Sequence, residues 1–214
     1  EPVVRLAEAS ALTALGLRTL AGDALDALCA AFPAAADRDD VRRLRERIAA
    51  LAPDRIDPEQ LARRAEFAAA ALAERVAHLA GALDRWRERA AGVEAFLATD
   101  GNVVRRRADG SLELVGDHRA AADALIAQHR AALAASPAPI TIEGLDPPWL
   151  ALAMLGATEA SGYAPGLRLV QADAVELLDG CALADVSPLL DAPRVEWFVG
   201  ESAADRLAET VRAE

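Results

Sequence analysis

Apolar residues recur at helical spacing through the first hundred residues of the chain. Residues 3–32 carry apolar side chains, with breaks near Gly16 and Gly22 that indicate two short helices. The same spacing returns over residues 40–51, where arginines occupy the positions between the apolar residues. That pattern is typical of a helix with one buried stripe and a charged outer surface. The sequence therefore predicts a helical N-terminal part.

The longest periodic segment runs from residue 61 to residue 97. Its apolar side chains follow one another in steps of three and four, with two successive steps of four around Leu72. Asp57 and Pro58 precede it as an N-cap and a first-turn proline. The spacing is that of a heptad seam, and it predicts one helix of about 40 residues, about 60 Å long at a rise of 1.5 Å per residue.

The apolar stripe of such a helix needs a partner. Two partners are possible. The short helices before it fold back onto the stripe, which is the arrangement we favour, or a second copy of the chain packs against it. In the second case a homodimer interface would use six large side chains of the stripe: Leu61, Leu72, Leu79, Leu83, Trp86 and Leu97.

The periodicity changes after this segment. Short apolar runs on either side of Ala108-Asp109-Gly110 predict a β-hairpin, because Asp-Gly favours the backbone conformations of tight turns. Three consecutive arginines, at 105–107, fall on its first strand. They either guard an exposed sheet edge, which we favour, or meet a phosphate. A helix is predicted next, over residues 118–135.

From residue 139 the pattern becomes strand–helix, repeated three times. The predicted strands are Ile140–Glu143, Leu167–Gln171 and Val195–Val199, and helices are expected over 148–155, 174–178 and 203–213. Short apolar strands that alternate with helices predict a parallel sheet.

The predicted fold class is α/β with a large helical N-terminal part: a long heptad helix, a β-hairpin and then a small Rossmann-like parallel sheet. Residues 1–100 are predicted to form a helical arm, and residues 101–214 the hairpin together with the Rossmann-like domain.

Charge and composition narrow the classes of function. The net charge is −11, and the segment from Pro137 onward holds 13 acids against 4 arginines, which argues against nucleic-acid binding. Charged residues interrupt every apolar stretch well before the ~20 residues of a membrane span. Cys29 and Cys181 show no paired spacing, so reduced thiols and a cytoplasmic location are predicted. Because the chain opens with Glu1, it is open whether it is a piece of a longer protein.

The loop after the first parallel strand is the first place to look for a ligand. In nucleotide-binding α/β domains this loop is rich in glycine, so that backbone N–H groups meet a phosphate. Here it reads Gly144-Leu145-Asp146-Pro147-Pro148. Proline has no N–H to donate, and Asp146 repels a phosphate. No cofactor is predicted, and a nucleotide sugar is only weakly supported because the loop is poor in glycine.

The ends of the other two strands complete the candidate site. Gln171 occupies the position where an acidic residue usually binds ribose hydroxyls, and Asp173 either serves that role or caps the next helix, which we favour. The weak ligand-binding set is Gly144, Asp146, Gln171, Asp173 and Gly200. We find no catalytic set and no metal-binding spacing among the histidines, His78, His118 and His129, so whether the chain is an enzyme stays open.

Several short motifs in this region resemble a known family. They are Leu169-Val170-Gln171-Ala172-Asp173, Asp185-Val186-Ser187-Pro188 and Pro193-Arg194-Val195 followed by Phe198-Val199-Gly200. They resemble the Rossmann-like N-terminal regions of bacterial glycosyltransferases of the spore-maturation type and of the motility-accessory-factor family. The resemblance covers about residues 139–206. It departs from the family pattern at Gln171, where the family has glutamate, and in the loop after Gly144, where the family has more glycines.

Three functions follow from these observations. The resemblance implies an accessory domain of a bacterial glycosyltransferase, which positions an acceptor or assists assembly with a further domain and is not catalytic alone. The heptad helix instead favours a non-enzymatic interaction or dimerisation module, and the strand pattern allows a small methyltransferase-like enzyme. An enzyme should keep an open crevice beside Gly144, Gln171 and Gly200, whereas an accessory module should fill it, with Trp149 or Trp197.

Overall fold

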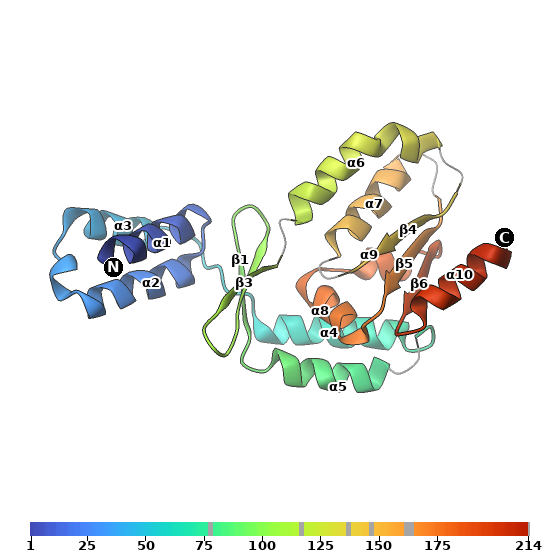
Figure 1. Cartoon of the computed structure of the whole chain (residues 1–214), viewed down its shortest axis with the longest axis horizontal. Coiled ribbons are helices and arrows are strands. Elements are labelled where there is room, and N and C mark those ends of the chain that lie inside the picture. Colours follow the sequence, from blue (N-terminus) through green and yellow to red (C-terminus); the bar gives the residue numbers. More distant parts are fainter. Residues whose placement is uncertain (77–78, 116–117, 136–137, 146–147, 161–164, 214) are drawn as a thin grey trace. The chain divides into compact units, whose positions relative to one another are not determined.

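The computed structural model describes residues 1–76, 79–115, 118–135, 138–145, 148–160 and 165–213. The chain is mixed α/β: a helical N-terminal part is followed by a three-stranded antiparallel sheet and a three-stranded parallel sheet with interleaved helices (Figure 1). It divides into two compact units. Unit 1 consists of residues 1–56 and 94–114, and unit 2 of residues 57–93 and 115–214. The predicted boundary at residue 100 falls inside unit 1.

Unit 1 begins with helices that enclose a small apolar core. They are α1 (Pro2–Ala14), α2 (Arg18–Ala31), the 3-10 turn η1 (Pro33–Ala35) and α3 (Asp39–Ala49). The predicted break at Gly16 is confirmed, since this residue has a φ of +76° between α1 and α2, a conformation that glycine adopts without strain. Gly22 instead lies inside α2. The stripe on α3 is buried as predicted, through Val41, Leu44 and Ile48.

The antiparallel sheet of unit 1 has the order β1-β2-β3, with β1 (Glu94–Leu97), β2 (Val103–Arg106) and β3 (Leu112–Val115). The predicted hairpin is confirmed as β2–β3, with Gly110 at a φ of +81° in its turn. Phe96 and Val104 are paired across β1 and β2 and pack against Leu17 and Leu20. The guard position foreseen for the three arginines is wrong, because β2 is the central strand of this sheet.

The single long helix predicted over residues 61–97 is wrong. The segment forms α4 (Pro58–Leu72), α5 (Leu79–Ala90) and strand β1. The N-cap prediction is confirmed, since the Asp57 carboxylate accepts a bond from the Glu59 N–H. The first helix ends at Leu72, where the heptad spacing is irregular, and Gly92, at a φ of +77°, follows the end of the second.

The physical reason for this break is the position of the core. A continuous helix would carry the apolar residues after Leu72 away from the sheet, whereas the break lets α4 and α5 lie against each other and both against α8 (Figure 1). Leu72, Leu79 and Trp86 are buried inside the chain, at 0%, 2% and 4% exposure. Most of the stripe assigned to a homodimer is therefore covered by unit 2 itself, while Leu97 lies in β1 and is half exposed.

Unit 2 is built on the parallel sheet β4-β5-β6, whose strands are Ile140–Glu143, Leu167–Gln171 and Val195–Val199, with the boundaries predicted from sequence. Its other helices are α6 (His118–Ala135), α7 (Trp149–Ala160), α8 (Ala174–Leu183), α9 (Ser187–Asp191) and α10 (Ala203–Ala213). The helices predicted over 118–135 and 203–213 are confirmed. Those predicted over 148–155 and 174–178 are longer in the structure, and α9 was not foreseen.

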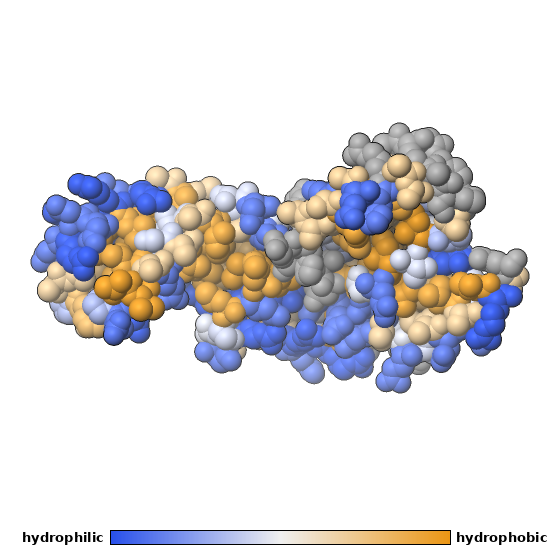
Figure 2. Space-filling view, turned by 45° about the horizontal axis from the view of Figure 1, so that its top comes forward, coloured by the Kyte–Doolittle hydropathy of each residue, from blue (hydrophilic) through white to orange (hydrophobic). Residues whose placement is uncertain are grey.

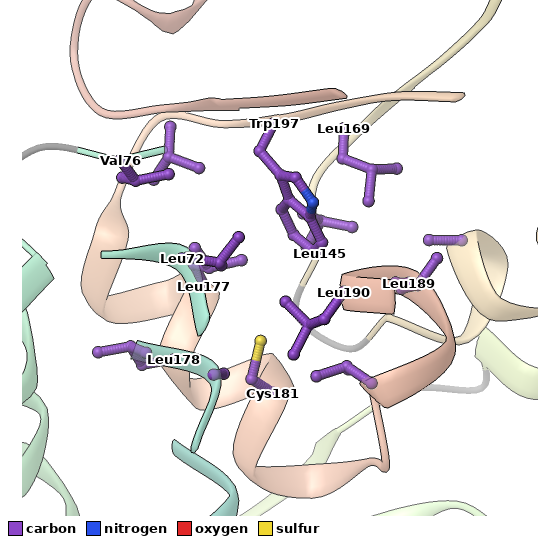
Figure 3. Packing of buried hydrophobic residues seen from close by; sticks show 14 of the residues in the cluster. Leu72, Val76, Leu145, Leu169, Leu177, Leu178, Cys181, Leu189, Leu190 and Trp197 are labelled. Atoms are coloured by element: carbon purple, nitrogen blue, oxygen red, sulfur yellow. The ribbon is translucent and has the colours of Figure 1, made fainter. Parts of the chain in front are cut away.

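The two faces of the parallel sheet are covered differently. Leu167, Leu169 and Trp197 point to one face and join a large core that includes side chains of α4 to α9 (Figure 3). Val170 and Phe198 point to the other face, where Ala203 of α10 packs on them. The core thus lies mainly on the face that carries α7, α8 and α9.

None of the described helices is long and apolar enough to cross a membrane.

Candidate functional site

The carboxyl ends of the three parallel strands bring together three of the predicted site residues. The Gly144 N–H donates to the carbonyl of Val170 (3.0 Å), and the Gly200 N–H donates to the carbonyl of Gln171 (2.9 Å). Both glycines have positive φ, +85° and +101°, where a residue with a Cβ would be strained. The chain therefore turns sharply away from the sheet after β4 and after β6, with Gln171 at the end of the strand between them.

Gln171 is the centre of this arrangement and is only 6% exposed. Its Oε1 accepts a hydrogen bond from the Leu145 N–H (2.8 Å), and its Nε2 donates to the carboxylate of Glu176 in α8 (2.8 Å). A glutamate at this position would place a second carboxylate against Glu176. The amide thus ties the loop after β4 to the first turn of α8.

Asp173 has the role that we favoured from sequence. It is the N-cap of α8, and its Oδ1 accepts a bond from the Val175 N–H (2.7 Å), which satisfies one free donor of the first turn. Asp146, the remaining member of the predicted set, lies outside the described residues. Of the candidate ligand groups, two are therefore bound within the fold, at Gln171 and Asp173.

Apolar side chains fill the space below these strand ends. Leu145, directly after β4, is 1% exposed, and Trp197 is 8% exposed. Figure 3 shows the indole of Trp197 pointing from β6 toward Leu145 and Leu190. On the outer side, a Cβ added at Gly144 or Gly200 would meet nothing within 4 Å. The edge is thus closed toward the core and open beside the two glycines.

The motifs that carry the family resemblance have structural roles in this chain. Asp185 accepts bonds from the N–H and the hydroxyl of Ser187 (3.0 and 2.7 Å) just before α9. The hydroxyl, followed by the backbone N–H, holds the pKa of the Asp185 carboxyl below its usual value. Arg194 donates to the carbonyls of Pro165 (2.8 Å) and Leu155 (3.0 Å) and so fastens the segment before β5 to α7. Both motifs organise turns and helix ends.

The sequence did not predict one buried polar cluster. Asp179 of α8, 7% exposed, accepts a hydrogen bond from the Trp86 indole N–H (2.7 Å). It also forms an ion pair with Arg89 (3.0 Å). These contacts join α5 to α8. The heptad pattern placed Trp86 in a seam but gave no sign of a polar partner, because residues 93 positions apart along the chain carry no shared local pattern.

Arg106, at the end of β2, and the next residue, Arg107, both form ion pairs within unit 1. Arg106 lies over the ring of Phe96, with its guanidinium carbon 5.4 Å from the ring centre, and it pairs with Asp23 and with Glu94. The Asp23 carboxylate, more than that of Glu94, raises the pKa of Arg106. Arg107 pairs with Glu113 at 2.7 Å. These contacts engage both side chains inside the unit and disfavour the phosphate alternative.

Metal binding finds no support in the part of the chain that the structure describes, where no group of three or more histidine, cysteine, aspartate or glutamate side chains is arranged to hold an ion. Comparison with known proteins adds no identity: no protein-family model matches the chain, and no curated protein or solved structure matches it significantly. The assignment of function therefore depends on the site itself.

Proposed function

We propose that the chain is an accessory module of a bacterial glycosyltransferase, which positions an acceptor or assists assembly and does not catalyse transfer by itself. In this proposal the parallel sheet is a Rossmann-like half-domain. The observation that carries the non-catalytic part is the double engagement of Gln171. Both ends of its buried amide are bonded within the fold, to Leu145 and Glu176, at the position where a nucleotide-binding domain keeps an acidic group for its ligand.

The glycosyltransferase part of the proposal rests on the motif resemblance over residues 139–206. The apolar filling under the strand ends supports an accessory role, since Trp197 and Leu145 occupy the volume beneath the loop. A partner would instead meet the outer rim, beside Gly144 and Gly200. Whether such a partner is a sugar acceptor or a further protein domain is a matter for experiment.

A small methyltransferase-like enzyme is the second candidate. It is favoured by the open space next to Gly144 and Gly200, which a ligand could approach closely because neither residue carries a side chain. It requires the Gln171 amide to exchange at least one of its internal bonds for a bond to the ligand.

The discriminating experiment compares ligand binding with stability in Gln171→Ala. The wild-type chain is titrated with UDP-N-acetylglucosamine, GDP-mannose and S-adenosylmethionine by calorimetry and by thermal shift, because a ligand of the native state must raise its stability. We expect no shift with any of the three. Gln171→Ala should lower the free energy of unfolding by about 1–3 kcal/mol, since it leaves the buried groups of Leu145 and Glu176 without their partner.

Saturable binding of one of these ligands by the wild-type chain would contradict the proposal if Gln171→Ala abolished this binding while changing the free energy of unfolding only a little. Asp173→Asn is the matched control, because asparagine retains the N-cap acceptor and should leave both quantities nearly unchanged. Gly144→Pro is not a useful variant, since proline fixes φ near −65° where the fold requires +85°.

A further inference from the structure

The antiparallel sheet of unit 1 has two different edges. At β1, the chain covers the edge itself: the Leu97 N–H donates to the carbonyl of Asp54 (2.7 Å), and the Ile56 N–H donates to the carbonyl of Ala95 (2.8 Å). At the other side lies β3, whose only strand neighbour among the described residues is β2. As far as the structure describes the chain, the sheet is therefore closed along β1 and open along β3.

The hairpin geometry fixes which backbone groups of β3 face outward. The Arg107 N–H donates to the carbonyl of Ser111 (2.9 Å), so the backbone groups of these two residues face each other across the hairpin, although the Ser111 N–H donates to the Asp109 carboxylate in the turn. Bonded and non-bonded positions alternate along an antiparallel pair. The N–H and C=O groups of Glu113 thus point toward β2, and those of Leu112 and Leu114 point to the open edge.

The side chains of the same two residues are exposed. Leu112 is 43% exposed and Leu114 58% exposed, and alternation places both on the sheet face that carries Phe96. Figure 2 shows apolar surface over the part of the molecule that these strands occupy. Edge strands are usually protected by charges or proline, because an open edge with apolar side chains pairs with other strands. This edge has only Glu113 between two leucines.

We propose that β3 pairs antiparallel with the β3 of a second copy of this chain, which joins two three-stranded sheets into one. A two-fold axis at Glu113 places Leu112 of each copy opposite Leu114 of the other. Both positions present outward backbone groups, so each pair exchanges two hydrogen bonds and the outward groups of both strands are satisfied. The four leucines meet on one face of the joined sheet.

The charges of the strand are compatible with this register. The two Glu113 side chains would lie opposite each other on the second face, which by itself is unfavourable. Each of them, however, already holds Arg107 at 2.7 Å, and the hairpin register places Arg105 opposite Glu113 on β2. Two carboxylates would therefore lie among four guanidinium groups. A foreign strand would have to reproduce both the apolar spacing and this charge pattern, whereas a second copy carries them already.

The size of the contact sets the strength of the dimer. Stable interfaces bury roughly 1,600 Å² in total, and a four-residue strand with two leucines from each copy covers much less. Association should therefore be reversible and dependent on concentration. This surface differs from the heptad stripe first assigned to a homodimer, most of which is buried in unit 2.

Sedimentation of the purified chain tests the proposal. Between about 10 μM and about 500 μM, the weight-average mass should rise from 22.4 kDa toward twice that value. Leu114→Lys should stay at the monomer mass over the same range, while Leu125→Lys, which changes an exposed leucine of α6, should behave like the wild type. A constant monomer mass for the wild type, or a dimer that both variants retain, would overturn the proposal.

A disulfide cross-link tests the register. In a Cys29→Ser background, Glu113→Cys should form an intermolecular disulfide under mild oxidation, because residues on the two-fold axis of an antiparallel pair bring their Cβ atoms within bonding reach. Asp109→Cys, in the hairpin turn, is the control and should remain reduced. Equal cross-linking of both variants, or of neither, would exclude pairing about Glu113.

Discussion

The two sheets of this protein handle polar groups in different ways. The parallel sheet of unit 2 buries polar side chains that have specific partners: Gln171 bonds to Leu145 and Glu176, and Arg168, 5% exposed, pairs with Glu196. The antiparallel sheet of unit 1 keeps its charges nearer the surface, in the network around Arg106. Buried bonds and apolar packing therefore stabilise the sheet of unit 2, whereas the sheet of unit 1 depends in part on electrostatics that salt can screen.

The apolar cores of the two units also differ in size and continuity. Unit 2 has one large apolar cluster and a small second one where α10 packs on the parallel sheet, whereas unit 1 has two small clusters, one between its helices and one under its sheet. The three tryptophans, Trp86, Trp149 and Trp197, all belong to unit 2. Tryptophan fluorescence therefore reports the unfolding of unit 2, and hydrogen exchange of α2 and β2 amides reports unit 1, so that the two units can be compared within one molecule.

The largest expected effect is in the core of unit 2. Leu72→Ala removes a side chain with 0% exposure and should lower the free energy of unfolding by about 2–5 kcal/mol, because the surrounding residues close only partly over the cavity. Urea denaturation followed by tryptophan fluorescence measures it.

Two comparisons make that result specific. Phe67→Ala changes an aromatic residue of the same helix that is 52% exposed, and it should cost no more than about 0.5 kcal/mol. The loss in Leu72→Ala should also be the same at all protein concentrations. A loss that shrinks on dilution would mean that Leu72 lies in a dimer interface after all, because the contribution of a dimer to the stability of the wild type falls with protein concentration.

An intermediate effect is expected from the ion pairs of unit 1. Arg106→Ala removes the pairs with Asp23 and Glu94 and the contact with the Phe96 ring, and should lower the stability of unit 1 by about 1–2 kcal/mol at low salt. At about 1 M NaCl, where the screening length falls to about 3 Å, much of that difference should disappear. Hydrogen exchange of the β2 and α2 amides measures it.

The matched variant in unit 2 is Asp179→Ala. It leaves the buried indole N–H of Trp86 without an acceptor, a penalty of desolvation that salt does not relieve. The variant also removes the ion pair with the half-exposed Arg89, which salt screens, so its cost should fall with salt much less than that of Arg106→Ala. If both variants respond to salt equally, the contrast between the units is wrong.

The smallest effect concerns pH and the turn before α9. The Ser187 hydroxyl and N–H lower the pKa of Asp185 in the folded chain, so its contribution to stability is present above the unfolded pKa of about 3.9 and is lost as the pH falls through the folded pKa. Asp185→Asn should cost less than about 1 kcal/mol at pH 7, because the residue is exposed, and the cost should decrease as the pH falls below about 3.9. Urea titrations at pH 7 and at acidic pH values measure it, and a cost that does not decrease with falling pH would contradict the assignment.

The sequence was most informative where the signal is local. The parallel strands were predicted to the residue, because each is a short apolar run bounded by proline, glycine or aspartate. The N-cap of α4 and the turn at Gly110 were predicted for the same reason, since one or two residues decide them. Of the candidate site, the sequence indicated that Gly144, Gln171 and Gly200 meet at one edge, because parallel strands end together.

Tertiary structure decided the features that local pattern leaves open. Heptad spacing from Leu61 to Leu97 is equally compatible with one long helix and with two helices that pack on a shared core, and only the presence of α8 beside them selects the second. Likewise, Gln171 looked like a weakened ligand position until the fold placed Leu145 and Glu176 at its two ends. The parallel strands, the turn at Gly110 and the start of α4 were readable from the sequence because they depend on neighbouring residues, whereas β1, which the heptad pattern assigned to a helix, was not. The break in the heptad helix, the Trp86–Asp179 bond and the engagement of Gln171 join residues distant along the chain, and only folding brings such residues together.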